Sequence, residues 1–167
     1  MICLKCLAKL ENVSGENVVC NNCGIELNTK EVEFLSQYKD VLKQLNQSKV
    51  LYLDDFGYTY FVSQYFCDKK DYDNKMKCIN FGLENNSKCC FHGYANSYYH
   101  GEGVEKDLVK CYELLKQTEN STFTKSIISL GYLYCSGNGC EHDCDKAISL
   151  FEKAVELGDT NAYTQWA

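Results

Sequence analysis

Apolar residues recur every three or four positions through most of the chain after residue 28, a spacing that places them on one face of an α-helix. The stripes cover residues 29–47, 51–67, 71–85, 87–99, 106–117, 122–135 and 143–157. From residue 51 onward they come in pairs joined by short polar or glycine-containing stretches, which are typical of turns that fold two helices back on each other. The pattern therefore predicts a mostly α chain built from helical hairpins.

An offset of 36 residues relates the last two of these hairpins without a gap. It superimposes Tyr98 on Tyr134, Gly101 on Gly137, Gly103 on Gly139, Asp107 on Asp143 and Lys110 on Lys146. A period in the thirties is typical of helix-pair solenoids, in which each hairpin covers an apolar face of the next. We therefore predict a short α-α solenoid over residues 51–167, with about three hairpins and the start of a fourth at Asp159.

The aromatic stretch at residues 51–67 is also compatible with a β-strand, because aromatic residues favour strands. Its position two periods before the last hairpin, with Tyr58 under Leu130 and Val62 under Tyr134, favours the first helix of an earlier hairpin instead. That hairpin has residues 68–71 (DKKD) in place of the Gly-x-Gly turn.

Residues 130–162 carry the pattern LG-x-LY-x-x-G-x-G followed by D-x-x-KA-x-x-L-x-x-KA-x-x-x-GD-x-x-A. This pattern resembles the Sel-one-like repeat, a relative of the tetratricopeptide repeat, and residues 94–115 fit it with Cys111 in place of alanine. The resemblance implies a concave surface, built by the first helices of the hairpins, that binds a peptide or helix of another protein. The residues it places toward this face are Tyr60, Ser63, His92, Asn96, Tyr99, Tyr132 and Cys135. The alternative is that several of these side chains pack between hairpins.

Two Cys-x-x-Cys pairs, Cys3 with Cys6 and Cys20 with Cys23, are separated by thirteen residues near the N-terminus. Pairs with this spacing can place four thiolates around one tetrahedral Zn²⁺. A closed four-sulfur site has no open coordination position, so we expect one structural zinc and no catalysis there. Metal binding should supply most of the folding free energy of so small a module, which we assign to residues 1–28.

The module resembles a zinc ribbon, with expected strands at Val18–Val19 and from Ile25 to Leu27. Zinc ribbons often contact nucleic acid, but the formal net charge of −6 does not favour binding to a phosphate backbone. Four ligands and no histidine do not complete a RING-type ubiquitin ligase, which binds two zinc ions. A transcription-related or ubiquitin-pathway role is therefore kept only as an alternative.

Residues 29–50 are expected to form a connecting amphipathic helix that covers the first hairpin. Asn28 and Glu31 have the spacing of a helix N-cap and a capping box, in which the glutamate reaches back to the N-cap backbone. At the starts of two later helices, Asp107 and Asp143 are predicted to cap free backbone N–H groups.

The sequence Cys140-Glu-His142-Asp-Cys144 invites a second metal site. The 36-residue offset places its two cysteines under Val104 and Leu108, however, which favours packing cysteines and a solvated His142. No nucleophile, triad or phosphate-binding loop is recognisable, so no catalytic residue is predicted.

Twelve cysteines would suit a disulfide framework in a secreted protein, but eight of them lie in the helical region. Cysteine substitutes well for small apolar residues in helical cores, and no apolar run approaches the length of a membrane span or a signal sequence. We therefore expect a cytoplasmic protein in a reducing compartment. The overall prediction is a non-enzymatic adaptor that binds a protein or peptide.

Overall fold

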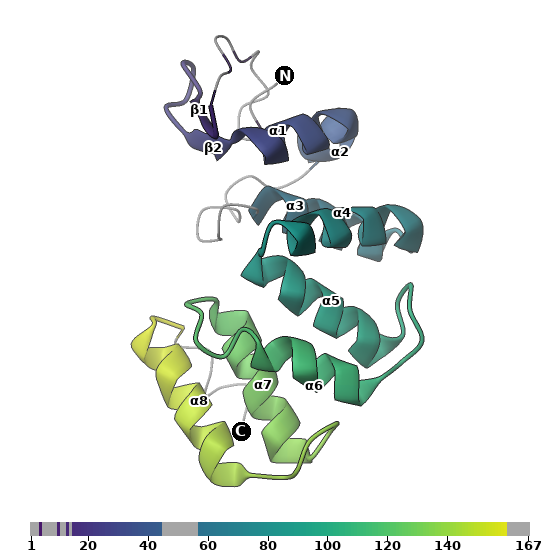
Figure 1. Cartoon of the computed structure of the whole chain (residues 1–167), viewed down its shortest axis with the longest axis vertical. Helices are drawn as coiled ribbons and strands as arrows, with labels where there is room; N and C mark the ends of the chain where they lie inside the picture. The colour runs from purple at the N-terminus through teal and green to yellow at the C-terminus, as the bar shows by residue number, and fades with distance from the viewer. Residues whose placement is uncertain (1–3, 5–9, 11–12, 14, 45–56, 160–167) are drawn as a thin grey trace. The chain divides into compact units, whose positions relative to one another are not determined.

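The structure, a computed structural model, describes residues 4, 10, 13, 15–44 and 57–159. The chain divides into two compact units, residues 1–87 and 88–167 (Figure 1). Several predicted features lie outside the described residues. They are Cys3 and Cys6, the end of the connecting helix, residues 51–56 and nearly all of the fourth hairpin.

The first unit begins with a small antiparallel hairpin of two strands, β1 (Asn17–Val19) and β2 (Glu26–Asn28). Val18 lies opposite Leu27, and both side chains are buried. The strands flank the second cysteine pair, which confirms the strands predicted there.

Three short helical segments follow: α1 (Thr29–Leu35), the 3₁₀ turn η1 (Ser36–Tyr38) and α2 (Lys39–Gln44). The Asn28 side chain accepts hydrogen bonds from the backbone nitrogens of Lys30 at 3.0 Å and Glu31 at 3.4 Å, so the predicted N-cap is confirmed. The apolar stripe is also present, with Val32, Leu35 and Leu42 fully buried.

The Glu31 carboxylate, which a capping box would direct back to the N-cap backbone, binds a later helix. Its Oε1 atom accepts hydrogen bonds from Thr59 N at 2.6 Å and from Thr59 Oγ1 at 2.8 Å, in the first turn of α3 (Gly57–Asp68). A carboxylate at a helix N-terminus satisfies free N–H groups and interacts favourably with the helix dipole. Glu31 is 1% exposed, so this buried contact fastens α1 to α3.

We expect Glu31→Ala to lower the free energy of unfolding of the first unit by about 2–3 kcal/mol, because it removes a charged acceptor from buried donors. Glu33→Ala is the matched control, since Glu33 lies on the exposed side of the same helix. Urea unfolding of both variants checks the expectation. Equal loss of stability in the two would show that the carboxylate has no special role.

In the first unit α3 pairs with α4 (Tyr72–Glu84), and Asp71 caps α4 by accepting from Asn74 N. The β-hairpin, the connecting helices and this helical hairpin share one hydrophobic core. Its buried members are Leu4, Leu10, Val18, Cys20, Leu27, Val32, Leu35, Leu42, Tyr58, Val62, Phe66 and Cys78. The first unit therefore combines segments that the sequence assigned to three separate regions.

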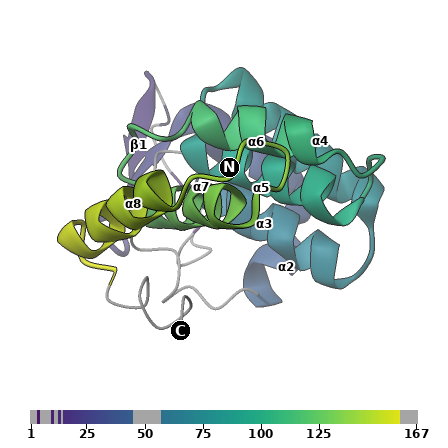
Figure 2. The same ribbon diagram turned by 90° about the horizontal axis from the view of Figure 1, so that it is seen from below.

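The second unit contains two helical hairpins, α5 (Lys88–His100) with α6 (Leu108–Lys116) and α7 (Thr124–Ser136) with α8 (Cys144–Glu156). Figure 2 shows α7 and α8 side by side. Their close approach depends on Gly131, where a Cβ atom would lie 2.7 Å from Cε1 of the buried Phe151 ring. Helix α7 also contacts α5 and α6, so the two hairpins stack.

Each hairpin turn is closed by the same backbone hydrogen bond. The backbone nitrogen of the N-cap aspartate donates to a carbonyl near the end of the preceding helix. The pairs are Asp71 with Phe66 at 2.9 Å, Asp107 with Tyr98 at 3.0 Å, and Asp143 with Tyr134 at 2.9 Å. The Asp107 and Asp143 side chains cap α6 and α8, so both predicted N-caps are confirmed.

This hydrogen bond also corrects the register of the first hairpin. It aligns Phe66, and not Val62, with Tyr134. The connection without the Gly-x-Gly turn is four residues shorter, since Phe66 precedes its aspartate by five positions and Tyr98 precedes its own by nine. Four residues are about one helical turn. The predicted register of α3 is therefore wrong by one turn.

Candidate functional site

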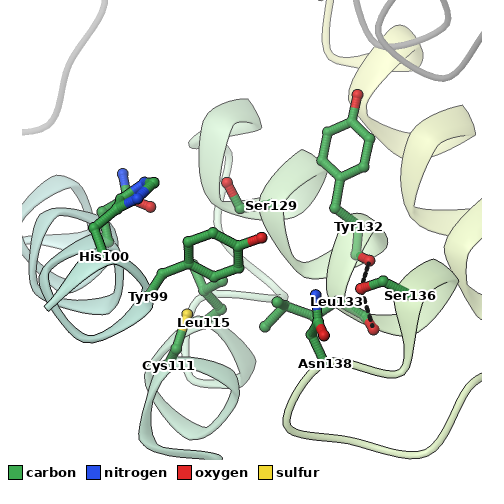
Figure 3. A pocket seen from close by; sticks show the side chains of 10 residues that line it. Tyr99, His100, Cys111, Leu115, Ser129, Tyr132, Leu133, Ser136 and Asn138 are labelled. Carbon is green, nitrogen blue, oxygen red and sulfur yellow. Dashed lines mark hydrogen bonds between the residues drawn. The ribbon is translucent and has the colours of Figure 1, made fainter. Parts of the chain in front are cut away.

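The second unit has a pocket of about 360 Å³ formed by α5, α6, α7 and the turn after α7 (Figure 3). It is lined by Asn96, Tyr99, His100, Cys111, Leu115, Ser129, Tyr132, Leu133, Ser136 and Asn138. None of these ten lining residues is a lysine, arginine, aspartate or glutamate.

Helical periodicity explains why these side chains meet. Asn96 and Tyr99 are three residues apart on α5, while the four lining residues of α7 recur at intervals of three, one and three. From α6, Cys111 and Leu115 are four residues apart and 1% exposed, so they form an apolar floor. First helices thus supply most of the polar groups, and the second helix supplies the floor.

Figure 3 shows the Tyr99 ring extending from α5 into the pocket. The ring is braced from outside the pocket lining by Lys106, whose Nζ lies 5.7 Å from the ring centroid. Among the residues that the structure describes, the Tyr99 hydroxyl and the carboxamides of Asn96 and Asn138 have no hydrogen-bond partner. These groups remain available to a ligand.

Behind the pocket, His92 Nε2 lies 3.2 Å from Ser129 Oγ, and the imidazole packs edge-on against Phe123 with 5.5 Å between ring centroids. Burial lowers the pKa of His92 to about 4, and the nearby Lys125 charge acts in the same direction. His92 is therefore neutral at pH 7 and a weak base. It positions the Ser129 hydroxyl, but this serine–histidine contact is poorly suited to activating a nucleophile.

Three of the seven residues predicted for the concave face, Asn96, Tyr99 and Tyr132, line the pocket. The Tyr132 ring points away from Tyr99 and packs edge-on against Phe151 with 5.4 Å between centroids (Figure 3). Burial of the phenol raises the pKa of Tyr132, with a smaller effect from Cys135. Cys135 itself is half-buried against the core of the second unit.

The other three predicted residues are buried, with exposures of 4% for Tyr60, 0% for Ser63 and 5% for His92. The corrected register explains the first two. Tyr60 aligns with His92, and Ser63 aligns with Ala95, at positions that face the core in both hairpins. The positions equivalent to Asn96 and Tyr99 are Gln64 and Cys67, both half-buried.

The remaining lining residues were not predicted from the sequence. Ser129 and Ser136 lie three residues before and four residues after Tyr132, so helical spacing from a predicted position could have found them. Helical spacing could not have identified Asn138 as a lining residue, because its position depends on the conformation of the turn after α7.

At the second cysteine pair, Gly24 N donates to Cys20 O and Cys20 N donates to Ile25 O, both at 2.8 Å. Gly24 has φ +71°, a conformation that favours glycine. At this tight turn Cys20 is 1% exposed and Cys23 is half-buried. In the described part of the chain no three histidine, cysteine, aspartate or glutamate side chains gather as potential metal ligands.

Of Cys140, His142 and Cys144, the structure brings the side chains of His142 and Cys144 together. Cys144 Sγ lies 3.4 Å from His142 Nε2, and both residues are exposed. Cys140 packs partly buried against the core of the second unit, and burial raises the pKa of its thiol. The packing interpretation therefore suits Cys140 but is wrong for Cys144, because Cys144 is the first residue of α8 and lies on its solvent side.

Stacked hairpins with a repeated turn are the defining features of a helical-repeat protein. Comparison with known families identifies the kind of repeat. Residues 89–118 and 124–159, which are the two hairpins of the second unit, match the model of the Sel1 repeat. These segments are thus Sel1 repeats, as the sequence pattern indicated, and they cover less than half of the chain. Repeats of this class are typically non-catalytic and mediate contacts between proteins.

A similar fold occurs in the crystal structure of a Sel1 repeat protein from Oxalobacter formigenes. The two chains are 21% identical, and the match covers 63% of this chain and 83% of the other with a TM-score of 0.55. No curated protein matches the sequence. None of the helices within the described residues is long and apolar enough to cross a membrane.

Proposed function

We propose that this protein is a non-enzymatic adaptor whose Sel1 repeats bind an extended segment of a partner protein in the pocket between α5, α6 and α7. The observation that carries the proposal is the composition of the pocket. It combines an apolar floor, the Tyr99 ring and two carboxamides that have no hydrogen-bond partner among the described residues.

Each of these features suits an extended peptide. The backbone of such a segment presents alternating N–H and C=O groups, and a carboxamide can donate to one and accept from the other. An apolar side chain of the partner would rest on Cys111, Leu115 and Leu133. The lining offers no lysine or arginine to a phosphate group, so the pocket does not favour nucleic acid.

We further propose that Cys3, Cys6, Cys20 and Cys23 hold one structural Zn²⁺. Support comes from the tight turn at Cys20 and Cys23 and from the spacing of the two pairs. The ion would supply folding free energy and no open coordination position. A cytoplasmic, reducing location, which we propose with it, keeps the thiols free to bind metal.

The peptide-binding proposal can be tested by selecting linear peptides from a displayed random library on the full chain. We expect selected peptides to share an apolar anchor residue. Tyr99→Ala and Asn96→Ala should each weaken their binding by about tenfold or more, which corresponds to about 1.4 kcal/mol of lost contact energy. Isothermal titration calorimetry measures the change.

Val109→Ala is the matched control, because Val109 is 56% exposed on α6 and does not line the pocket. Its binding should equal that of the wild type. Peptides that bind all three variants with wild-type affinity would place the binding surface elsewhere and contradict the proposal. Failure to select any peptide from a folded chain would contradict it as well.

A further inference from the structure

A lysine is buried in the first unit beside a cysteine. Lys75, in the first turn of α4, is 1% exposed, and its Nζ atom lies 3.3 Å from Sγ of Cys67 near the end of α3. The same Nζ atom also lies 5.8 Å from the ring centroid of Tyr72. Most buried lysines extend their amine to solvent along an apolar stem, whereas this one points its amine at a thiol.

Comparison between hairpins shows that the repeat does not require a lysine here. Counted from the N-cap aspartates, Lys75 occupies the position of Cys111 in α6 and Ala147 in α8. Both of those side chains are small and 1% exposed. Burying an amine in place of such a residue costs free energy unless polar groups compensate, and the Cys67 thiol is one such group in the first hairpin.

The thiol in this contact can be reached from solvent. Cys67 is half-buried, in contrast to the fully buried Cys78, Cys89 and Cys90. In the corrected register it aligns with Tyr99 and Cys135. Cys135 is half-buried as well, but the residue of its hairpin equivalent to Lys75 is Ala147, which has no amine.

We propose that Cys67 and Lys75 form an oxidation-sensitive pair, which a hydroperoxide converts into a covalent sulfur–nitrogen link between α3 and α4. In the first step the thiol sulfur is oxidised to a sulfenic acid, and hydrogen peroxide is reduced to water. In the second step the Lys75 nitrogen attacks that sulfur and the S–O bond breaks. The departing hydroxide leaves as water with a proton from the nitrogen.

The product is a sulfenamide, the same class of bond that sulfenic acids form with backbone nitrogen. Relative to the starting thiol and amine, it has lost two hydrogen atoms. Two equivalents of a small thiol reverse the reaction, because they regenerate Cys67 and Lys75 and leave as a disulfide. The link would join the two helices of the first hairpin at their turn, as a reversible brace.

The test is to treat the full, metal-replete chain with hydrogen peroxide and analyse its proteolytic peptides by mass spectrometry. We expect a cross-linked peptide pair containing residues 67 and 75, lighter by two hydrogens than the sum of its parts and released by dithiothreitol. Cys135 is the internal control, since it should be oxidised without any link to lysine. Lys75→Met should abolish the cross-link and leave Cys67 as sulfenic or sulfinic acid.

The proposal is overturned if Cys67 is found only as thiol, oxyacid or disulfide, with Lys75 unmodified, in samples in which Cys135 has been oxidised. Because the measurement on the wild-type chain needs no substitution, it decides the question even if Lys75→Met fails to fold. It is also independent of peptide binding in the second unit.

Discussion

Gly139→Ala is expected to lower the free energy of unfolding of the second unit by about 3 kcal/mol, from backbone strain and overpacking together. Gly139 lies in the turn after α7 with φ +75°, a conformation that costs an alanine energy. A Cβ atom there would also overlap the backbone carbonyl of Leu108 and lie 2.9 Å from Val109 N, at the start of α6. Backbone cannot move aside as a flexible side chain can.

Gly137→Ala separates the two causes, because Gly137 has a similar φ of +67° but its nearest neighbour would be His142 Cβ at 3.5 Å, an ordinary contact. We expect this control to cost about 1 kcal/mol from backbone strain alone. Urea unfolding followed by circular dichroism measures both variants. Equal losses would show that the turn does not pack against α6 as described.

Removal of the proposed zinc ion is expected to unfold the whole first unit and not only the residues around the metal. The reason is the shared core, in which Val18, Cys20 and Leu27 of the β-hairpin pack in one cluster with Val62 and Phe66 of α3. Structural zinc contributes about 10–16 kcal/mol in small modules. That is as large as the total stability of a typical domain, about 5–15 kcal/mol.

Hydrogen exchange of the full chain, with and without a zinc chelator under reducing conditions, measures this effect. Amides of α3 and α4 should lose protection on chelation, whereas amides of α7 and α8, which belong to a separate core, should keep theirs. Cys20→Ser should reproduce the loss, and Cys144→Ser is the exposed control. Loss confined to residues 17–28 would contradict the shared core, and a chain without bound zinc would contradict the metal proposal.

Local patterns in the sequence predicted the local features of the fold. The helices follow from the spacing of apolar residues, and Asp107 and Asp143 were recognisable as caps from their place before a stripe. The paired glycines marked the turns because positive φ values suit glycine, and Gly101 and Gly137 adopt them. Each of these features depends on a few neighbouring residues.

Long-range contacts were not predictable in this way. Glu31 had the spacing of a capping box, yet its carboxylate binds Thr59, twenty-eight positions away. The register of α3 depended on how a shorter turn is closed, and an ungapped offset cannot represent that. For the candidate site, Asn96 and Tyr99, which were predicted for a concave face, line the pocket from α5, but the contribution of Asn138 depends on the path of a loop.

The aspartate-to-carbonyl hydrogen bond that closes each turn has a consequence for how such repeats tolerate length changes. The bond has nearly the same length whether five or nine positions separate its ends, so the two helices of a hairpin keep the same anchor points. Residues between the anchors are therefore an adjustable spacer. The turn after α7 is an exception, because Gly139 packs against α6 and Asn138 lines the pocket. In the other turns, insertions or deletions should alter the rim of a hairpin and leave its helix pairing intact, which makes those turns suitable places to graft a tag or a new binding loop.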